Sequence, residues 1–282
     1  MLARPSAPPT AMAIADPAAP TEAPMTTSSM TPAPRGAERR ALVVGASSGI
    51  GAALVRQLAR DGYRVGALAR RADLLEALAA DCADAPGSVS VRAHDVRATD
   101  EVPELFEELV RELGGLDLFI YAAGVMPAVG RSEYDTDKDL AQVAVNLAGA
   151  MAWCNAAARL ITTQRAGTIV GIGSIAGDRG RKGNPAYHAT KAGLATYLES
   201  LRNRLAEVGA HVLTVKPGFV DTPMTEGVPG MFWVISAEQA ARTILASARH
   251  RRWNTRYVPL RWWAVGAVIR AIPSFLFRRL NI

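Results

Sequence analysis

The residues best suited to chemistry in this chain are Tyr187 and Lys191, four positions apart, with Ser174 thirteen positions before the tyrosine. Residues four apart on a helix lie on one face, one turn from each other. A phenol acts as an acid near neutral pH when its pKa falls from about 10, and a nearby ammonium favours such a fall. The spacing therefore predicts that Lys191 lowers the pKa of Tyr187 and that the pair transfers a proton.

A glycine-rich turn, Gly45-Ala46-Ser47-Ser48-Gly49-Ile50-Gly51, lies between an apolar run and an amphipathic segment. Gly45 permits a sharp turn, and the later glycines let the backbone and a helix N-terminus approach a pyrophosphate without a Cβ in between. A tight strand-to-helix turn without a ligand is the alternative interpretation. The placement between strand and helix favours nucleotide binding, and hence a proton-transfer pair beside a hydride carrier.

The end of the second predicted strand indicates which nicotinamide coenzyme binds. Ala69 stands where a carboxylate usually contacts a free ribose 2′-hydroxyl, and Arg70 and Arg71 follow at once. A guanidinium meets a 2′-phosphate with two parallel hydrogen bonds, although arginines at a strand end can also be solvated charges. The sequence favours NADP(H) over NAD(H), with Arg70 at the phosphate.

Two further strand ends carry candidate coenzyme contacts. Asp95-Val96 follows the third predicted strand, where Asp95 can accept a hydrogen bond from an adenine amino group or cap the turn into the next helix. Tyr121-Ala122-Ala123-Gly124 ends the fourth, where the small residues Ala123 and Gly124 leave room for a coenzyme against the backbone.

Short apolar runs alternate with amphipathic segments along most of the chain. Such alternation predicts an α/β fold, with one Rossmann-type doubly wound parallel sheet and helices on both faces, over residues 40–259. The predicted strands cover residues 41–44, 64–69, 88–93, 116–122, 168–173, 210–215 and 256–258. The predicted helices cover residues 50–61, 72–83, 99–113, 138–163, 186–208 and 237–249.

Composition limits the remaining possibilities. Residues 1–39 are rich in Pro, Ala, Thr and Ser without an apolar period, which predicts a disordered leader. The only cysteines, Cys82 and Cys154, indicate a reducing, cytoplasmic location and no disulfide, and no metal-ligand spacing is present. The net charge is +6, but the basic residues are scattered without an aromatic platform, which argues against a nucleic-acid partner.

Residues 41–224 resemble the short-chain dehydrogenases/reductases that carry the YxxxK signature. The matching segments, in chain order, are the glycine turn, Ala122-Ala123-Gly124, Val145-Asn146-Leu147, Ser174, Tyr187 with Lys191, and Pro217-Gly218-Phe219-Val220-Asp221-Thr222. Two departures are Val44, where the family usually has Thr, and Tyr121-Ala122, where it often has two asparagines. Both are expected to affect local bracing of the backbone more than activity.

The resemblance implies a role for each matching residue. Tyr187 is the general acid, Lys191 lowers its pKa and holds the nicotinamide ribose, and Ser174 polarises the substrate carbonyl. Asn146 positions a water that relays protons, and Thr222 fixes the carboxamide. The residues expected to bind coenzyme are Gly45, Ser47, Ser48, Gly49, Ile50, Gly51, Arg70, Asp95, Val96, Ala123, Gly124, Tyr187, Lys191, Pro217, Gly218, Val220 and Thr222. A homodimer or homotetramer is expected through the helices over 138–163 and 186–208.

Two features bear on the substrate. Residues 260–282 mix Trp, Phe and Arg with apolar residues, interrupted by Arg270 and Pro273. This tail is suited to an amphipathic helix in a membrane interface, or to a segment that covers the substrate pocket or a partner subunit. The loop 178–182 carries three cations, which can hold a phosphate or carboxylate or can be solvated.

Together these features fit an anionic, amphipathic substrate. The tail and the segment Lys216-Pro217-Gly218 also resemble, more weakly, the reductase of polyprenyl-phosphate-linked keto-pentose. The sequence thus predicts an NADPH-dependent ketoreductase on a hydrophobic or lipid-linked substrate. The alternative is a catalytically silent, cofactor-binding regulator or scaffold of the same fold. The complete set of Asn146, Ser174, Tyr187 and Lys191 argues against it.

Overall fold

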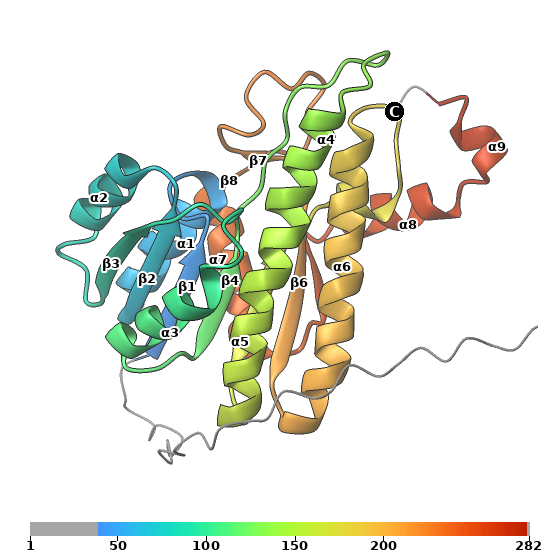
Figure 1. Ribbon diagram of the computed structural model, residues 1–282. Helices are drawn as coiled ribbons and strands as arrows, with labels where there is room; N and C mark the ends of the chain where they lie inside the picture. Colours follow the sequence, from blue (N-terminus) through green and yellow to red (C-terminus); the bar gives the residue numbers. More distant parts are fainter. Residues whose placement is uncertain (1–38, 281–282) are drawn as a thin grey trace, which may run out of the picture. The chain divides into compact units, whose positions relative to one another are not determined.

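The computed structural model describes residues 39–280, which contain a sheet of seven parallel strands in the order β3-β2-β1-β4-β5-β6-β9 (Figure 1). The chain moves outward from β1 to β3 and then returns to β4 on the other side of β1. A ligand crevice is expected at the carboxyl ends of the strands where this reversal occurs. The strands are β1 Arg39–Val44, β2 Tyr63–Ala69, β3 Ser88–Ala93, β4 Leu118–Tyr121, β5 Thr168–Ile172, β6 His211–Pro217 and β9 Thr255–Val258.

Helices cover both faces of this sheet, as the sequence predicts for strands that are apolar on both sides. Val43 and Ile120 belong to the core under α1 Gly49–Arg60, α2 Ala72–Asp81 and α7 Ala237–His250. Their neighbours Leu42 and Phe119 belong to the core under α3 Val102–Leu113, α5 Ala150–Gln164 and α6 Pro185–Leu205. The predicted α/β class with a doubly wound parallel sheet is confirmed.

The helix predicted over 138–163 is interrupted in the structure. α4 Thr136–Val143 is joined to α5 by a π-helical turn, Ala144–Gly149, and the Tyr121 hydroxyl donates a hydrogen bond of 2.6 Å to the Val145 carbonyl inside it. A π-helical turn inserts one residue into the helix, and such turns are frequent at functional sites. Apolar periodicity does not reveal a single inserted residue, so the sequence indicated one continuous helix.

The chain after β6 contains a separate two-stranded sheet that the sequence did not predict, formed by β7 Val220–Asp221 and β8 Ile235–Ser236. The predicted tail, residues 260–282, contains two helices after β9, α8 Trp262–Ala271 and α9 Ser274–Phe277. Trp262 is buried against Ile175 and Tyr257, so α8 begins as part of the folded domain. Within residues 39–280 no helix has the length and apolar character needed to cross a membrane.

The predicted disordered leader, residues 1–39, lies outside the described residues except for Arg39, which begins β1.

Candidate active site

A cavity of about 500 Å³ lies at the carboxyl ends of the central strands. Its walls come from the segments that follow all of the first six strands of the sheet, β1 to β6, together with α6 and the first residue of α8. The reversal of strand order predicts a binding crevice at this edge of the sheet.

The glycine turn forms one end of the cavity and depends on close backbone contacts. A Cβ on Gly45, whose φ is +91°, would lie 2.3 Å from the Ala123 nitrogen, and one on Gly51 would lie 2.1 Å from the Gly45 oxygen. The first residue of α1, Gly49, also lines the cavity, and the Ser48 side chain does not cap the helix. A bare helix N-terminus behind a tight glycine turn fits the pyrophosphate of a dinucleotide coenzyme.

Both arginines after β2 line this end of the cavity. The Arg71 guanidinium donates hydrogen bonds of 2.8 Å to the hydroxyl oxygens of Ser47 and Ser48, so Arg71 lies across the glycine turn. From the sequence, Arg70 alone was expected to bind the 2′-phosphate. Arg71 is a second candidate for that contact, because it reaches the two serines expected to bind coenzyme.

Sixteen of the seventeen predicted coenzyme residues line the cavity; the exception is Asp95. Its carboxylate accepts hydrogen bonds from the Arg97 backbone nitrogen at 3.0 Å and the Arg97 guanidinium at 2.6 Å, and the guanidinium lowers the pKa of Asp95. Asp95 therefore braces this turn, the alternative noted from sequence, and its contact with adenine stays a prediction. The adjacent Val96 lines the cavity.

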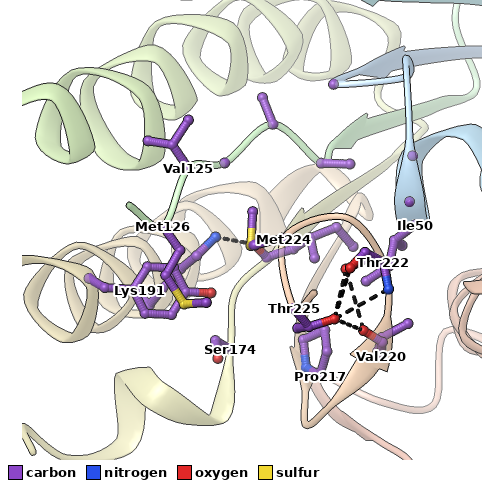
Figure 2. A pocket seen from close by; sticks show the side chains of 18 of the residues that line it. Ile50, Val125, Met126, Ser174, Lys191, Pro217, Val220, Thr222, Met224 and Thr225 are labelled. Carbon is purple, nitrogen blue, oxygen red and sulfur yellow. Dashed lines mark hydrogen bonds between the residues drawn. The ribbon is translucent and has the colours of Figure 1, made fainter. Parts of the chain in front are cut away.

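Ser174, Tyr187 and Lys191 all line the cavity, and Figure 2 shows Ser174 and Lys191 in its wall. Ser174 follows β5, and its hydroxyl hydrogen-bonds with Tyr187 on α6. The Lys191 ammonium, one helical turn further along α6, donates to the Ile172 carbonyl at 3.0 Å and lies 5.8 Å from the centre of the Tyr187 ring. The structure thus joins residues that are 13 and 4 positions apart in the chain.

The predicted fall in the pKa of Tyr187 is wrong in direction. Burial raises the pKa of Tyr187, and the effect that opposes this rise is the hydrogen bond with Ser174. Burial also lowers the pKa of Lys191 to about 8, because its ammonium is removed from water. Tyr187 is consequently protonated at neutral pH, which suits a proton donor.

Asn146 is fully buried and does not line the cavity. Its side chain donates to the Val125 carbonyl at 3.0 Å and to the Thr190 hydroxyl at 3.3 Å, and accepts from the Val125 nitrogen at 2.8 Å. Asn146 therefore fastens the loop after β4 to α6, directly beside the Tyr–Lys pair. The predicted positioning of a water by Asn146 stays a prediction.

The other end of the cavity is largely apolar and was not predicted residue by residue. Met126 and Met224 lie close to Lys191 in Figure 2, and Phe219 and Trp262 also line the cavity. Thr222 is held in the loop after β7, where its hydroxyl oxygen lies 3.3 Å from the Val220 carbonyl. The only sequence signal for Trp262 was the Trp-Trp pair, which had two open interpretations.

The three cations of the loop 178–182 lie in different surroundings. Arg179 donates to the Ile269 carbonyl at 2.6 Å and stacks over Phe277, with its guanidinium carbon 3.9 Å from the ring centre. Arg181 lines the cavity, whereas Lys182 is exposed. The loop is thus neither a single anion site nor a uniformly solvated segment.

Asp178, at the beginning of that loop, is the buried anchor of α8. Its carboxylate, only 2% exposed, forms ion pairs with Lys216 at 2.5 Å and Arg270 at 2.9 Å, and accepts from the Tyr257 hydroxyl at 2.9 Å. A Cβ on Gly266 would lie 2.5 Å from this carboxylate, so α8 packs against it.

A family model of the short chain dehydrogenases matches residues 39–230, and the matched region contains the glycine turn, Ser174, Tyr187 and Lys191. The chain belongs to this family. It is an oxidoreductase that acts with a nicotinamide coenzyme on a CH–OH or carbonyl group of a small-molecule substrate.

Similar proteins agree with this assignment. An uncharacterized oxidoreductase of Myxococcus xanthus is 38% identical over 66% of this chain and 74% of its own. The human 3-oxoacyl-[acyl-carrier-protein] reductase is 36% identical over 65% of this chain and 76% of its own. Among solved structures, gox2181 has a TM-score of 0.73 at 26% identity, covering 80% of this chain and 96% of its own. ElxO with NADP bound is 20% identical and has a TM-score of 0.71, with 79% of this chain and 97% of its own covered, so it shares the fold.

Proposed function

We propose that this short-chain dehydrogenase is an NADPH-dependent reductase of a ketone on a hydrophobic or lipid-linked substrate. The observation that carries the proposal is the Tyr187 hydroxyl, which burial keeps protonated beside Ser174 in the wall of the glycine-turn cavity. The apolar residues at the far end of this cavity, including Met126 and Phe219, support a hydrophobic substrate. A human relative is a reductase of 3-oxoacyl groups, which agrees with a ketone as the reacting group.

In this proposal the bound coenzyme supplies hydride. The protein supplies the proton, polarises the carbonyl and stabilises the group that has lost its proton. Ser174 donates a hydrogen bond to the carbonyl oxygen and thereby polarises it. Tyr187 donates its hydroxyl proton to the same oxygen. The charged Lys191, whose ammonium lies 5.8 Å from the centre of the Tyr187 ring, stabilises the phenolate left behind.

The direct test is NADPH oxidation by the full chain with a panel of ketones of increasing apolar length, together with lipid-linked keto sugars. Turnover that rises with apolar length supports the proposal, because longer chains bury more surface in the far end of the cavity. Tight NADPH binding without turnover of any ketone or of the corresponding alcohols would instead favour the cofactor-binding scaffold.

NADPH is expected to bind at least about tenfold more tightly than NADH, a difference of roughly 1.4 kcal/mol. The reason is charge-assisted hydrogen bonding of the 2′-phosphate by Arg70 and Arg71, in a wall where Ala69 provides no carboxylate. Fluorescence titration of both coenzymes into wild type, Arg70→Ala and Arg71→Ala measures this difference in affinity. Arg60→Ala, at the end of α1, is a control for the loss of one positive charge. Equal affinities in wild type, or an unchanged preference in both arginine variants, would contradict this proposal.

A homodimer or homotetramer is proposed through α4, α5 and α6. Figure 1 shows α5 and α6 side by side over one face of the sheet, and α4 carries Leu140 and Val143, which are 59% and 38% exposed. Light scattering at micromolar concentration is expected to give a multiple of 29.9 kDa, and Leu140→Glu is expected to lower it. Val268→Glu is the control, because it places the same charge on α8, outside these helices. A monomeric wild type would rule out this assembly.

Peripheral contact with the inner face of a membrane is proposed for the exposed side of α8 and α9. Trp263 and Phe275 are each 57% exposed there, and no acidic residue follows Glu238 in the sequence. Aromatic and apolar side chains with nearby arginines suit an anionic lipid surface, where each arginine contributes roughly 1 kcal/mol. Co-sedimentation with phosphatidylglycerol vesicles is expected for wild type and is expected to weaken in Trp263→Glu and Phe275→Glu. Absence of wild type from the vesicle pellet would end this proposal.

A further inference from the structure

The charges lining the cavity are all of one sign. Arg70, Arg71, Arg181 and Lys191 line it, and among residues 39–280 no Asp or Glu does. Arg70 and Arg71 flank the glycine turn, and Lys191 belongs to the proton-transfer pair. Arg181 has no part in either group, because it comes from the loop between β5 and α6.

Within residues 39–280, Arg181 forms no hydrogen bond or ion pair and is attracted by the Asp178 carboxylate only at longer range. Its Nε atom is buried without a hydrogen-bond partner, and burial lowers the pKa of the guanidinium. Arg179, two residues earlier, uses its guanidinium on backbone carbonyls of the C-terminal helices. Asp178, the nearest acid in sequence, is already bound by Lys216 and Arg270. A buried donor without an acceptor costs roughly 1–3 kcal/mol, and more when it is charged, which a bound acceptor would recover.

A second unpartnered donor belongs to a residue that lines the same cavity. The Trp262 indole nitrogen is buried without a hydrogen-bond partner. The indole packs closely against Gly218, where a Cβ would be 2.0 Å from this nitrogen. The Trp262 ring also packs against Phe219 and Phe232, with centroids 5.5 and 4.9 Å away. The donor is therefore set in an aromatic cluster.

We propose that Arg181 and Trp262 bind an anionic group of the substrate, a carboxylate or a phosphate, while the aromatic cluster of Phe219, Phe232 and Trp262 holds the apolar segment next to it. This inference rests on the proposed function for its reacting ketone. Arg181 provides the charge and several N–H groups, which suit two oxygens of one anion, and the Trp262 indole provides one more N–H. Both would be specificity-determining residues, distant in sequence from the proton-transfer pair.

Binding is tested with octanoate, octyl phosphate and octanamide, which share an alkyl chain and differ in the polar group. Calorimetric titration of the full chain is expected to give at least about tenfold tighter binding of one or both anions than of the neutral amide. The anion bound more tightly identifies the source as carboxylate or phosphate. Equal affinities for all three probes would overturn the inference without any variant.

Three variants test which residues cause the preference for an anion. Arg181→Gln is expected to remove the preference for the anion, about tenfold or more, and Trp262→Phe is expected to lower it about threefold while the aromatic cluster is retained. Lys182→Gln removes the same charge from an exposed neighbour and is expected to change nothing. An equal loss in Arg181→Gln and Lys182→Gln would mean a general charge effect and would overturn the assignment.

Turnover separates this inference from the proposed function. With NADPH, 7-oxooctanoate is expected to have a kcat/KM at least about tenfold above that of 2-octanone in wild type, and Arg181→Gln is expected to equalise the two. If 2-octanone is reduced just as well by wild type, the anion site is wrong and the reductase stands. If neither ketone is reduced while anion binding depends on Arg181, the site stands and the reductase proposal falls.

Discussion

Tyr187→Phe is expected to reduce ketone turnover by about 10²–10⁴-fold, the range typical of a lost general acid. The phenylalanine ring occupies the same space on α6, but it has no proton to donate to the carbonyl oxygen. Because the wild-type hydroxyl is buried and protonated, the loss should be present throughout the neutral pH range. Steady-state NADPH oxidation with the best ketone of the panel measures the effect.

The control is Tyr197→Phe, a tyrosine ten positions further along the same helix. Its hydroxyl donates to Asn155 on α5 at 2.8 Å and is remote from the cavity wall. We expect Tyr197→Phe to keep turnover within a few fold of wild type, and both variants to keep their NADPH affinity by fluorescence titration. Wild-type kcat in Tyr187→Phe would show that another group donates the proton.

Asp178→Ala is expected to lower the free energy of unfolding by about 3–5 kcal/mol, as when one partner of a buried ion pair is removed. The substitution leaves the Lys216 ammonium, whose side chain is 14% exposed, without its carboxylate. It also releases Arg270 and therefore loosens α8, which carries Trp262 into the cavity wall. For a domain of this size the midpoint of thermal unfolding should fall by roughly 6–20 °C.

Asp81→Ala is the matched comparison, because Asp81 pairs with Arg56 at the same 2.9 Å as the Asp178–Arg270 pair but is 56% exposed. An exposed pair contributes about 0–1 kcal/mol, so the midpoint should change by a few degrees at most. Differential scanning calorimetry of both variants separates the two cases. Equal midpoints in the two variants would mean that the buried carboxylate does not anchor α8.

The sheet and most of the site could be predicted because they depend on local patterns. The alternation of apolar runs and amphipathic helices predicts the strands in sequence order, and the spacing between Tyr187 and Lys191 predicts one helix face. The positive φ of Gly45 and Gly49 and the close approach of Gly51 to the Gly45 oxygen belong to one βα unit, so this part of the glycine pattern is equally local. Such features need no knowledge of which distant segments meet.

The remaining features depend on contacts between residues far apart in the chain. The sequence does not show that Asp178 meets Arg270, or that Trp262 packs on Gly218, because these pairs lie 92 and 44 residues apart. The pKa of Tyr187 was predicted in the wrong direction for the same reason: spacing gives the nearby ammonium but not the burial that outweighs it. Asp95 was ambiguous until its partner, Arg97, was known.

The uniform sign of the charges around the cavity also affects the kinetics of encounter. A concave surface with Arg70, Arg71, Arg181 and Lys191 and no lining carboxylate focuses a positive potential on approaching anions, and such focusing raises association rates by about 10- to 10³-fold. The Debye length falls from about 10 Å at 0.1 M salt to 3 Å at 1 M, so this attraction weakens with ionic strength. Oxidised coenzyme and an anionic alcohol product leave against the same potential. The features that speed capture should therefore slow product release, and added salt should shift the balance between the two.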